Sequence, residues 1–146
     1  MAIIEPQSFT LDPRLKADSI HIADLEVCQV RLMNDSRYLW ALLIPRIKDA
    51  REWHRLEADE SFGLHNEMRF IAKLIETQAD AFKMNVGALG NMVPQLHLHI
   101  IARQEGDAAW PGPVWGVGTA VPYDDVSAQR VKDRLWRMIK AVDMLH

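Results

Sequence analysis

Apolar residues recur along this chain at two spacings, and each spacing predicts one type of secondary structure. Between residues 57 and 82 they return at steps of three and four, with charged residues mostly on the other faces. The members of this row are Leu64, Met68, Ile71, Ile75 and Phe82. A period near 3.6 is typical of an amphipathic helix, so we predict one long helix over about 57–82 that covers a sheet.

The end of the chain follows the same helical rule. Either Asp124 or Asp125 can cap the N-terminus of a helix, and one apolar stripe follows them. The stripe consists of Val131, Leu135, Met138, Val142 and Leu145. We expect this C-terminal helix to pack against the core, without a ligand-binding role.

Four shorter segments predict strands. Residues 27–33 and 39–45 flank a turn, and the second segment is apolar enough to be buried on both faces. Residues 83–89 and 96–103 follow the long helix, and a turn at Gly90 joins them. Because this connection is short, we expect the two strands to be antiparallel neighbours. The pattern indicates an α+β fold, without internal repeats or a linker.

Composition narrows the class of protein. A chain of 146 residues that is 49% apolar has the size of one domain, which we expect to span 1–146. The net charge of −3, with both signs scattered, argues against binding to extended nucleic acid or to a membrane surface. Cys28 is the only cysteine, which fits a reducing compartment. Because the N-terminus also lacks the features of a signal peptide, we expect a cytoplasmic location.

The strongest chemical signal lies in 95–101, Gln-Leu-His-Leu-His-Ile-Ile. Side chains of a strand alternate between its faces, so Gln95, His97 and His99 are predicted to share one face and the apolar residues the other. Imidazole acts as nucleophile, general acid or base, or metal ligand near neutral pH. The row is therefore a candidate active site; a buried, hydrogen-bonded pair of histidines is the structural alternative.

Two neighbouring segments favour an active site. Residues 85–94 contain two glycines and two asparagines and run directly into the histidine strand, which indicates a tight turn. Exposed backbone N–H groups in such a turn can bind an anion. Residues 109–116, Ala-Trp-Pro-Gly-Pro-Val-Trp-Gly, add Trp110 and Trp115 in a stiff loop.

With these segments the chain resembles the histidine triad (HIT) family of nucleotide hydrolases and transferases. The family signature is His-x-His-x-His-x-x with apolar x, preceded by Asn or Asp and a glycine-rich turn; the Trp-Pro-Gly stretch is similar to the purine nucleoside phosphoramidase branch. The resemblance implies an antiparallel sheet of about five strands with one long helix and a C-terminal helix. It also implies a homodimer.

Two positions depart from the family pattern. Gln95 replaces the first signature histidine, and Trp40 stands where several members carry a further histidine that packs against the first. We take these as two halves of one altered contact. A carboxamide orients neighbours by hydrogen bonding but does not exchange protons as imidazole does, so the effect of Gln95 on rate depends on which role that position has.

The mechanism implied by the resemblance is a displacement at phosphorus. His97 would attack the α-phosphorus of a nucleoside phosphoramidate or phosphoanhydride and form a covalent nucleotidyl-histidine. His99 would donate to a phosphate oxygen or assist the leaving group, and Gln95 would position its neighbours. Backbone amides of Gly90, Asn91 and Met92 would stabilise the developing charge, without cofactor or metal.

The resemblance implies a ribose contact for Asn34 and a substrate contact for Asn85, which sits beside the signature strand. Trp110 and Trp115 would border the nucleotide or a partner subunit. Each also has an ordinary structural explanation, as a turn residue or as core.

Two other functions stay open from the sequence. With a degenerate triad, the chain would be a noncatalytic nucleotide-binding module. A metal site built from His97, His99 and a distant carboxylate is disfavoured, because zinc sites usually take at least three protein ligands and His-x-His supplies two.

Overall fold

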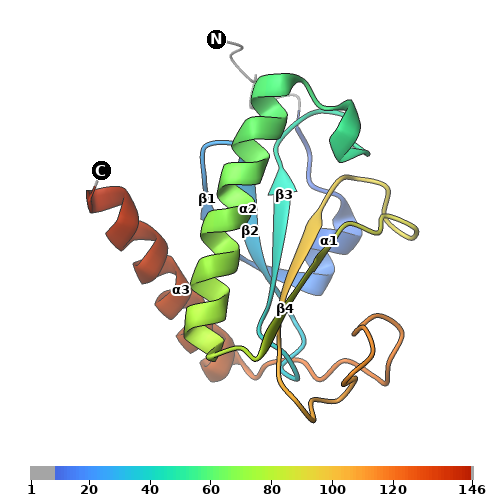
Figure 1. Cartoon of the computed structure of the whole chain (residues 1–146), viewed down its shortest axis with the longest axis vertical. Helices are drawn as coiled ribbons and strands as arrows, with labels where there is room; N and C mark the ends of the chain where they lie inside the picture. Colours follow the sequence, from blue (N-terminus) through green and yellow to red (C-terminus); the bar gives the residue numbers. More distant parts are fainter. Residues whose placement is uncertain (1–8, 146) are drawn as a thin grey trace.

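A five-stranded antiparallel sheet forms the centre of the protein (Figure 1). The computed structural model describes residues 9–145. The strands are β1 (Ser19–Asp24), β2 (Cys28–Met33), β3 (Trp40–Pro45), β4 (Lys83–Gly87) and β5 (Leu98–Arg103), in the spatial order β1-β2-β3-β5-β4. All neighbouring strands are antiparallel. The α+β class and the five-stranded antiparallel sheet are thus confirmed.

The two central strands carry the histidine segment and its support. All six residues of β3 are buried, as the unbroken apolar run predicts. In the register of β3 with β5, Trp40 lies opposite Ile101 and Leu42 lies opposite His99. On the other side of β5, Gly87 of the edge strand β4 lies opposite His99. The expected antiparallel pairing of β4 and β5 is confirmed, with both strands shorter than predicted.

Two long helices pack on one side of the sheet (Figure 1). Helix α2 (Ala58–Ala79) begins with a reciprocal capping box between Glu57 and Glu60. It ends because Asp80 adopts a left-handed conformation, with φ 46°. The predicted helix was therefore too long at its C-terminus: Phe82 lies outside it, 60% exposed, and its N–H donates to the carbonyl of Arg103.

Helix α3 (Asp125–Leu145) confirms the predicted C-terminal helix and packs against β1. Asp124 accepts a hydrogen bond from the N–H of Ser127 (2.8 Å) and thereby caps the helix. Leu135 is buried in the core beneath the sheet, together with Ile139. The side chain of Leu145, the last member of the predicted stripe, lies outside the described side chains.

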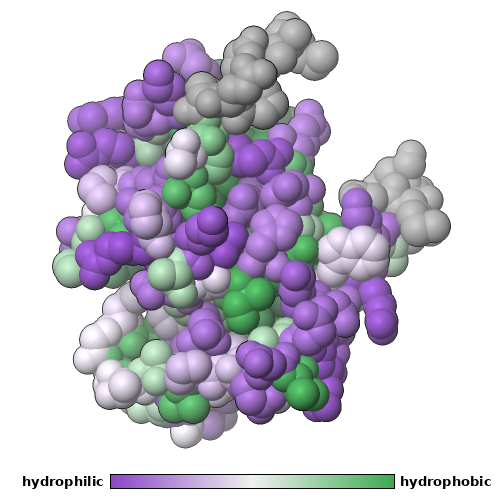
Figure 2. All heavy atoms as spheres, turned by 180° about the vertical axis from the view of Figure 1, so that it is seen from behind, coloured by the Kyte–Doolittle hydropathy of each residue, from purple (hydrophilic) through white to green (hydrophobic). Residues whose placement is uncertain are grey.

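The opposite face of the sheet has its own core. There, Trp40, Leu42 and Ile44 of β3 and Ile101 of β5 pack beneath helix α1 (Pro13–Asp18) and the loop after β5. Figure 2 shows the molecule from this side, with apolar residues between hydrophilic ones and a pale region at the lower left. Neither α1 nor β1 was predicted from the sequence. Among the described residues, no helix is long and apolar enough to cross a membrane.

Candidate active site

The two histidines of the signature segment lie together on the sheet face opposite α2. His97 immediately precedes β5 and His99 lies within it, so the predicted strand begins later than expected. The reason is local bonding: the N–H of Leu96 donates to the carbonyl of Ala50 (2.9 Å), which is outside the sheet ladder. The two imidazole centroids are nevertheless 5.0 Å apart, with an interplanar angle of 65°.

The protonation pattern of His97 is set by its own backbone neighbour. Nδ1 of His97 lies 2.7 Å from the carbonyl oxygen of Gln95. A carbonyl oxygen only accepts hydrogen bonds, so Nδ1 carries the proton and Nε2 of the neutral ring keeps a lone pair. The side chain is only 7% exposed. In the neutral ring, the nitrogen with the lone pair is therefore Nε2, the form in which an imidazole can attack an electrophile.

His99 has the opposite pattern. The indole N–H of Trp40 donates to Nδ1 of His99 (3.0 Å). Because an indole nitrogen is only a donor, Nδ1 must be unprotonated and the single proton of the ring resides on Nε2. Burial, followed by the neighbouring His97, lowers the pKa of His99 to about 3. His99 is therefore a neutral hydrogen-bond donor through Nε2 at physiological pH.

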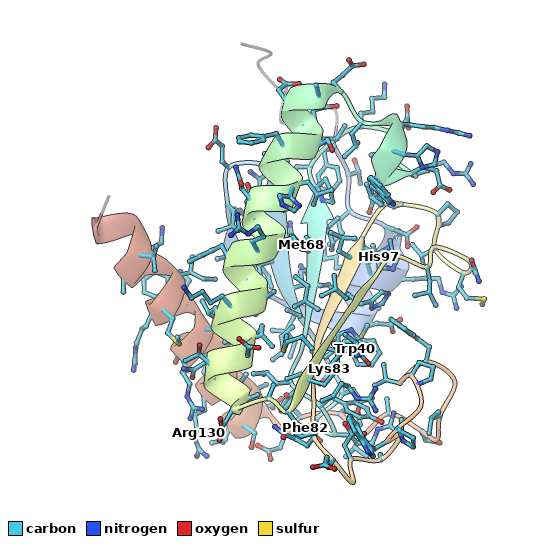
Figure 3. All side chains as sticks on the ribbon, viewed as in Figure 1. Trp40, Met68, Phe82, Lys83, His97 and Arg130 are labelled. Atoms are coloured by element: carbon cyan, nitrogen blue, oxygen red, sulfur yellow. The ribbon has the colours of Figure 1, made fainter. Side chains whose placement is uncertain are left out.

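Aromatic rings surround His99. The ring of Trp40 lies 5.6 Å from it and that of Trp115 5.2 Å, measured between centroids. An ideal Cβ added to Gly87 would lie 3.5 Å from the far edge of the Trp115 ring, so the indole packs closely over β4. In Figure 3, Trp40 and His97 lie on the side of β5 away from α2. These rings remove water from His99, which is the main cause of its lowered pKa.

The side chains of Gln95 and Trp40 form hydrogen bonds with different partners. The side-chain oxygen of Gln95 accepts from the N–H of Asp12 and its amide donates to the carbonyl of Thr10, both at 2.8 Å. The side chain thus holds the segment before α1, whereas Trp40 bonds to His99. No hydrogen bond joins the two side chains, because the carboxamide already satisfies two backbone groups and the indole N–H is directed to His99. The hypothesis of one remodelled contact stays a prediction.

The glycine-rich turn precedes the two histidines. Gly90 has a φ of +73°, a backbone conformation that residues other than glycine rarely adopt. Asn91 and Met92 are exposed, and the Met92 side chain is 73% accessible. Within residues 9–145, the amides of Gly90, Asn91 and Met92 donate no hydrogen bond to another protein group. They are therefore available to an anion.

The two predicted asparagines are already engaged through their carbonyl oxygens. Asn34 accepts from the N–H of Tyr123 (2.9 Å) and so holds the chain that enters α3. Asn85, opposite Ile101 on β4, accepts from Arg103 (2.8 Å). Asn34 follows β2 at the end of the sheet where β5 finishes, and His97 lies at the end where β5 begins. The structure does not bring Asn34 together with the histidines.

Arg103 organises the loop after β5 and was missed in the sequence. It is 1% exposed, forms a bidentate pair with Asp107 at 2.8 Å, and lies over the rings of Tyr38 and Trp110. The guanidinium lowers the pKa of Asp107 to about 2. Trp110, predicted to border the nucleotide, packs against Arg103 and Phe82 at this end of the sheet.

The ring beside the histidines is instead Trp115, carried by the same loop. Its proximity to His99 depends on a fold-back of the loop that no local pattern reveals. The spacing of Arg103 and Asp107, four residues apart with opposite charge, was the one signal that could have suggested an ordered loop. Among the described residues, no group of three or more histidines, cysteines or carboxylates could hold a metal ion.

Comparison with known proteins agrees with this geometry. The family model of the HIT domain matches residues 14–106. A histidine triad protein from Sinorhizobium meliloti is 43% identical with a TM-score of 0.88, covering 91% of this chain and 98% of its own. One from Marinobacter aquaeolei is 41% identical with a TM-score of 0.89, covering 92% and 98%.

A third similar structure is a histidine triad protein from Bradyrhizobium japonicum, 42% identical with a TM-score of 0.86, covering 89% of this chain and 97% of its own. Comparison with curated proteins gave no match. The family model covers well over half of the 146 residues and the similar structures cover nearly all of them. The chain therefore belongs to the histidine triad family.

Proposed function

We propose that this protein is a nucleotidyl hydrolase or transferase that cleaves a nucleotide at its α-phosphorus through His97. Family membership supports the broad class of nucleotide-binding hydrolases and transferases. The observation that carries the proposal is the hydrogen bond from Nδ1 of His97 to the Gln95 carbonyl, because it leaves Nε2 unprotonated and free to attack. The substrates we infer are nucleoside phosphoramidates and phosphoanhydrides.

The reaction would proceed in two displacements. Nε2 of His97 forms a bond to phosphorus while the bond to the leaving group breaks and its electron pair departs with that group. Water then attacks the nucleotidyl-histidine, the P–N bond breaks, and the electron pair returns to Nε2. The water keeps one proton as the P–OH of the monophosphate and gives the other to solvent; in a transferase, an alcohol or phosphate replaces the water.

Charge on the phosphoryl oxygens needs donors that are already in place. The free amides of Gly90, Asn91 and Met92 and the Nε2–H of His99 are the groups we assign to this task. Asn85 uses its carbonyl oxygen within the protein, which leaves its NH2 end for a substrate group. Asn34 lies at the other end of the sheet from His97 and is not part of the proposed site. Trp110 would contribute through the loop surface, and Gln95 through the orientation of His97.

A homodimer is part of the proposal. β4 is an edge strand, and a groove of about 750 Å³ runs between it and α2. Most of its lining is apolar, including the exposed side chains of Trp53, Phe62 and Val86. A second copy would cover this surface and pair with the open edge. A cytoplasmic location, inferred from the single cysteine, also stays a prediction.

Product formation in the first turnover tests the enzymatic proposal. We expect adenosine or guanosine phosphoramidates and phosphoanhydrides to yield the nucleoside monophosphate, with a burst of leaving group when enzyme and substrate are comparable in concentration. His97→Ala should abolish the burst, and His54→Ala, at an exposed position in η2 (Trp53–Arg55), should retain it. Nucleotide binding without turnover by the unmodified protein would indicate a noncatalytic binding module.

A further inference from the structure

The contact between Trp40 and His99 limits the number of protons that His99 can hold. The indole N–H points at Nδ1 of the imidazole, 3.0 Å away. A second proton on His99 would have to sit on this Nδ1. Two N–H groups would then face each other across the same distance and the hydrogen bond would be lost, leaving two buried donors unsatisfied.

Nothing packed against His99 compensates for a positive charge. Its cross-strand neighbours, Leu42 on β3 and Gly87 on β4, carry none, and Trp115 covers the ring from the loop. The titratable group in ring contact is His97, which is neutral or positive. In the part of the chain that the structure describes, no carboxylate forms an ion pair with His99.

We propose that Trp40 is a positioning residue that confines His99 to its neutral Nε2–H form, so that this site releases weakly basic oxyanions in preference to amines. The substrates it favours would be mixed anhydrides of a nucleoside monophosphate with a carboxylic or phosphoric acid. This inference rests on the proposed function and narrows its substrate class. It predicts that phosphoramidates are cleaved more slowly than these anhydrides.

Proton balance gives the reason. When a P–O bond of an anhydride breaks, the electron pair stays on the leaving oxygen, which is stable as a carboxylate or phosphate and needs only the hydrogen bond from Nε2–H of His99. When a P–N bond breaks, the nitrogen must receive a proton to leave as an amine. A neutral imidazole is far too weak an acid to transfer its only proton, whereas an imidazolium transfers one readily.

The first test compares two leaving groups on one nucleotide. Acetyl adenylate and adenosine 5′-phosphoramidate are assayed with the unmodified protein, Trp40→Phe and Trp115→Phe, and kcat/KM is reported as the ratio of phosphoramidate to acetyl adenylate. Using this ratio for each protein cancels the intrinsic reactivity of the substrates between variants. Trp40→Phe removes the donor to Nδ1 and should raise the ratio severalfold at pH 6. Burial, the main cause of the lowered pKa of His99, remains in this variant, so the gain should stay below the roughly 10²–10⁴ that a full general acid contributes. Trp115→Phe removes a similar ring but keeps that hydrogen bond, so its ratio should stay near the unmodified value.

The second test observes the tautomer of His99 in the unmodified protein. Long-range ¹H–¹⁵N spectra of histidine-labelled, unmodified protein should show His99, assigned by comparison with His99→Gln, as the Nε2–H tautomer from pH 5 to 8. A His99 signal that titrates near pH 6.5, or an Nδ1–H tautomer, would overturn the inference. So would an unchanged ratio in folded Trp40→Phe. Failure of both substrates to give His97-dependent product would overturn the proposed function itself, and the preference with it.

Discussion

His97 and His99 are chemically identical side chains two residues apart on one face of the sheet, yet they hold their protons on opposite nitrogens. Nδ1 of His97 donates to a carbonyl of its own segment, whereas Nδ1 of His99 accepts from an indole 59 residues away in sequence. One ring therefore offers a lone pair at Nε2 and the other a proton at Nε2. In the proposed mechanism, one residue type thus supplies both the nucleophile and a donor to the same phosphoryl group.

The two tautomers are fixed by different kinds of group, a backbone carbonyl for His97 and a side chain for His99. The carbonyl that orients His97 belongs to the backbone of Gln95, so a change of that side chain leaves the partner in place. The group that orients His99 is a side chain, so a change at Trp40 removes it. A glutamine at position 95 is thus compatible with the Nδ1–H tautomer of His97, and the identity of residue 40 decides the tautomer of His99.

Removing His97, the proposed nucleophile, should reduce activity the most. His97→Ala should lower kcat/KM by at least about 10⁴, as loss of a nucleophile does in other covalent mechanisms, while nucleotide affinity changes little. Steady-state assays and equilibrium binding of the monophosphate measure the two quantities. Retention of turnover within tenfold of the unmodified protein would remove His97 from the mechanism.

Removing His99, the proposed donor, should reduce activity less than removing His97. His99→Ala is expected to lower kcat/KM by about 10²–10³, the cost of one donor to developing charge. His99→Gln, whose amide can donate from a similar position, should lose clearly less. Equal losses in the two variants, at equal thermal stability, would show that the proton on Nε2 is not what His99 contributes.

The lowered pKa of His99 should appear in the pH dependence of the protein's stability. The pKa of His99 is lowered to about 3 in the folded state, whereas an unfolded histidine titrates at about 6.5, so between these values the unfolded state binds more protons. Stability should be fully present above pH 6.5 and fall as the pH decreases, with His99 adding a slope of up to about 1.4 kcal/mol per pH unit.

Urea unfolding of the unmodified protein and His99→Gln between pH 4 and 7 measures this contribution, with His54→Gln as an exposed control. The unmodified protein and the control should share the steep dependence, and His99→Gln should be shallower. Parallel curves for all three would contradict a neutral, buried His99.

The smallest effect concerns Gln95 and Trp40. Gln95→Ala should destabilise the protein by about 0.5–1.5 kcal/mol, because two backbone groups of the segment before α1 exchange the carboxamide for water. Combined with Trp40→Phe, the changes in unfolding free energy should add within about 0.5 kcal/mol, because the two side chains form hydrogen bonds with different partners. A coupling above about 1 kcal/mol would support the idea of one remodelled contact.

Periodicity was sufficient for the elements with strong local patterns. The α2 and α3 helices and the strands β2 to β5 follow from apolar spacing, although Phe82 was wrongly included in α2 because a left-handed Asp80 leaves no apolar signature. The two elements that were not predicted, α1 and β1, have weaker sequence signals. For α1 the signal is Asp12, which caps the helix by accepting from the N–H of Arg14, and for β1 it is the alternation of Ile20 and Ile22. Both segments are short, at six residues each.

The candidate site could be located from sequence but not resolved. The spacing of His97 and His99 placed both rings on one face, and the resemblance assigned their chemistry. Which nitrogen carries each proton depends on Trp40 and on a backbone turn at Gln95, and the position of Trp115 depends on a loop held by Arg103. Trp40 is 59 residues from His99 in sequence, and the turn at Gln95 and the path of the loop are backbone conformations that apolar spacing does not encode.

Trapping the covalent intermediate tests whether Nε2 of His97 is the atom that attacks phosphorus. A ¹⁵N-histidine-labelled protein is mixed with a nucleotide substrate, quenched under alkaline conditions within the first turnover, and digested. Peptide mass spectrometry and ³¹P–¹⁵N correlation are then used to locate the bond. We predict a nucleotidyl group on Nε2 of His97, present in the unmodified protein and absent from His97→Ala. A nucleotidyl group on Nδ1 of His97 or on His99, or turnover without any protein-bound nucleotide, would contradict the account.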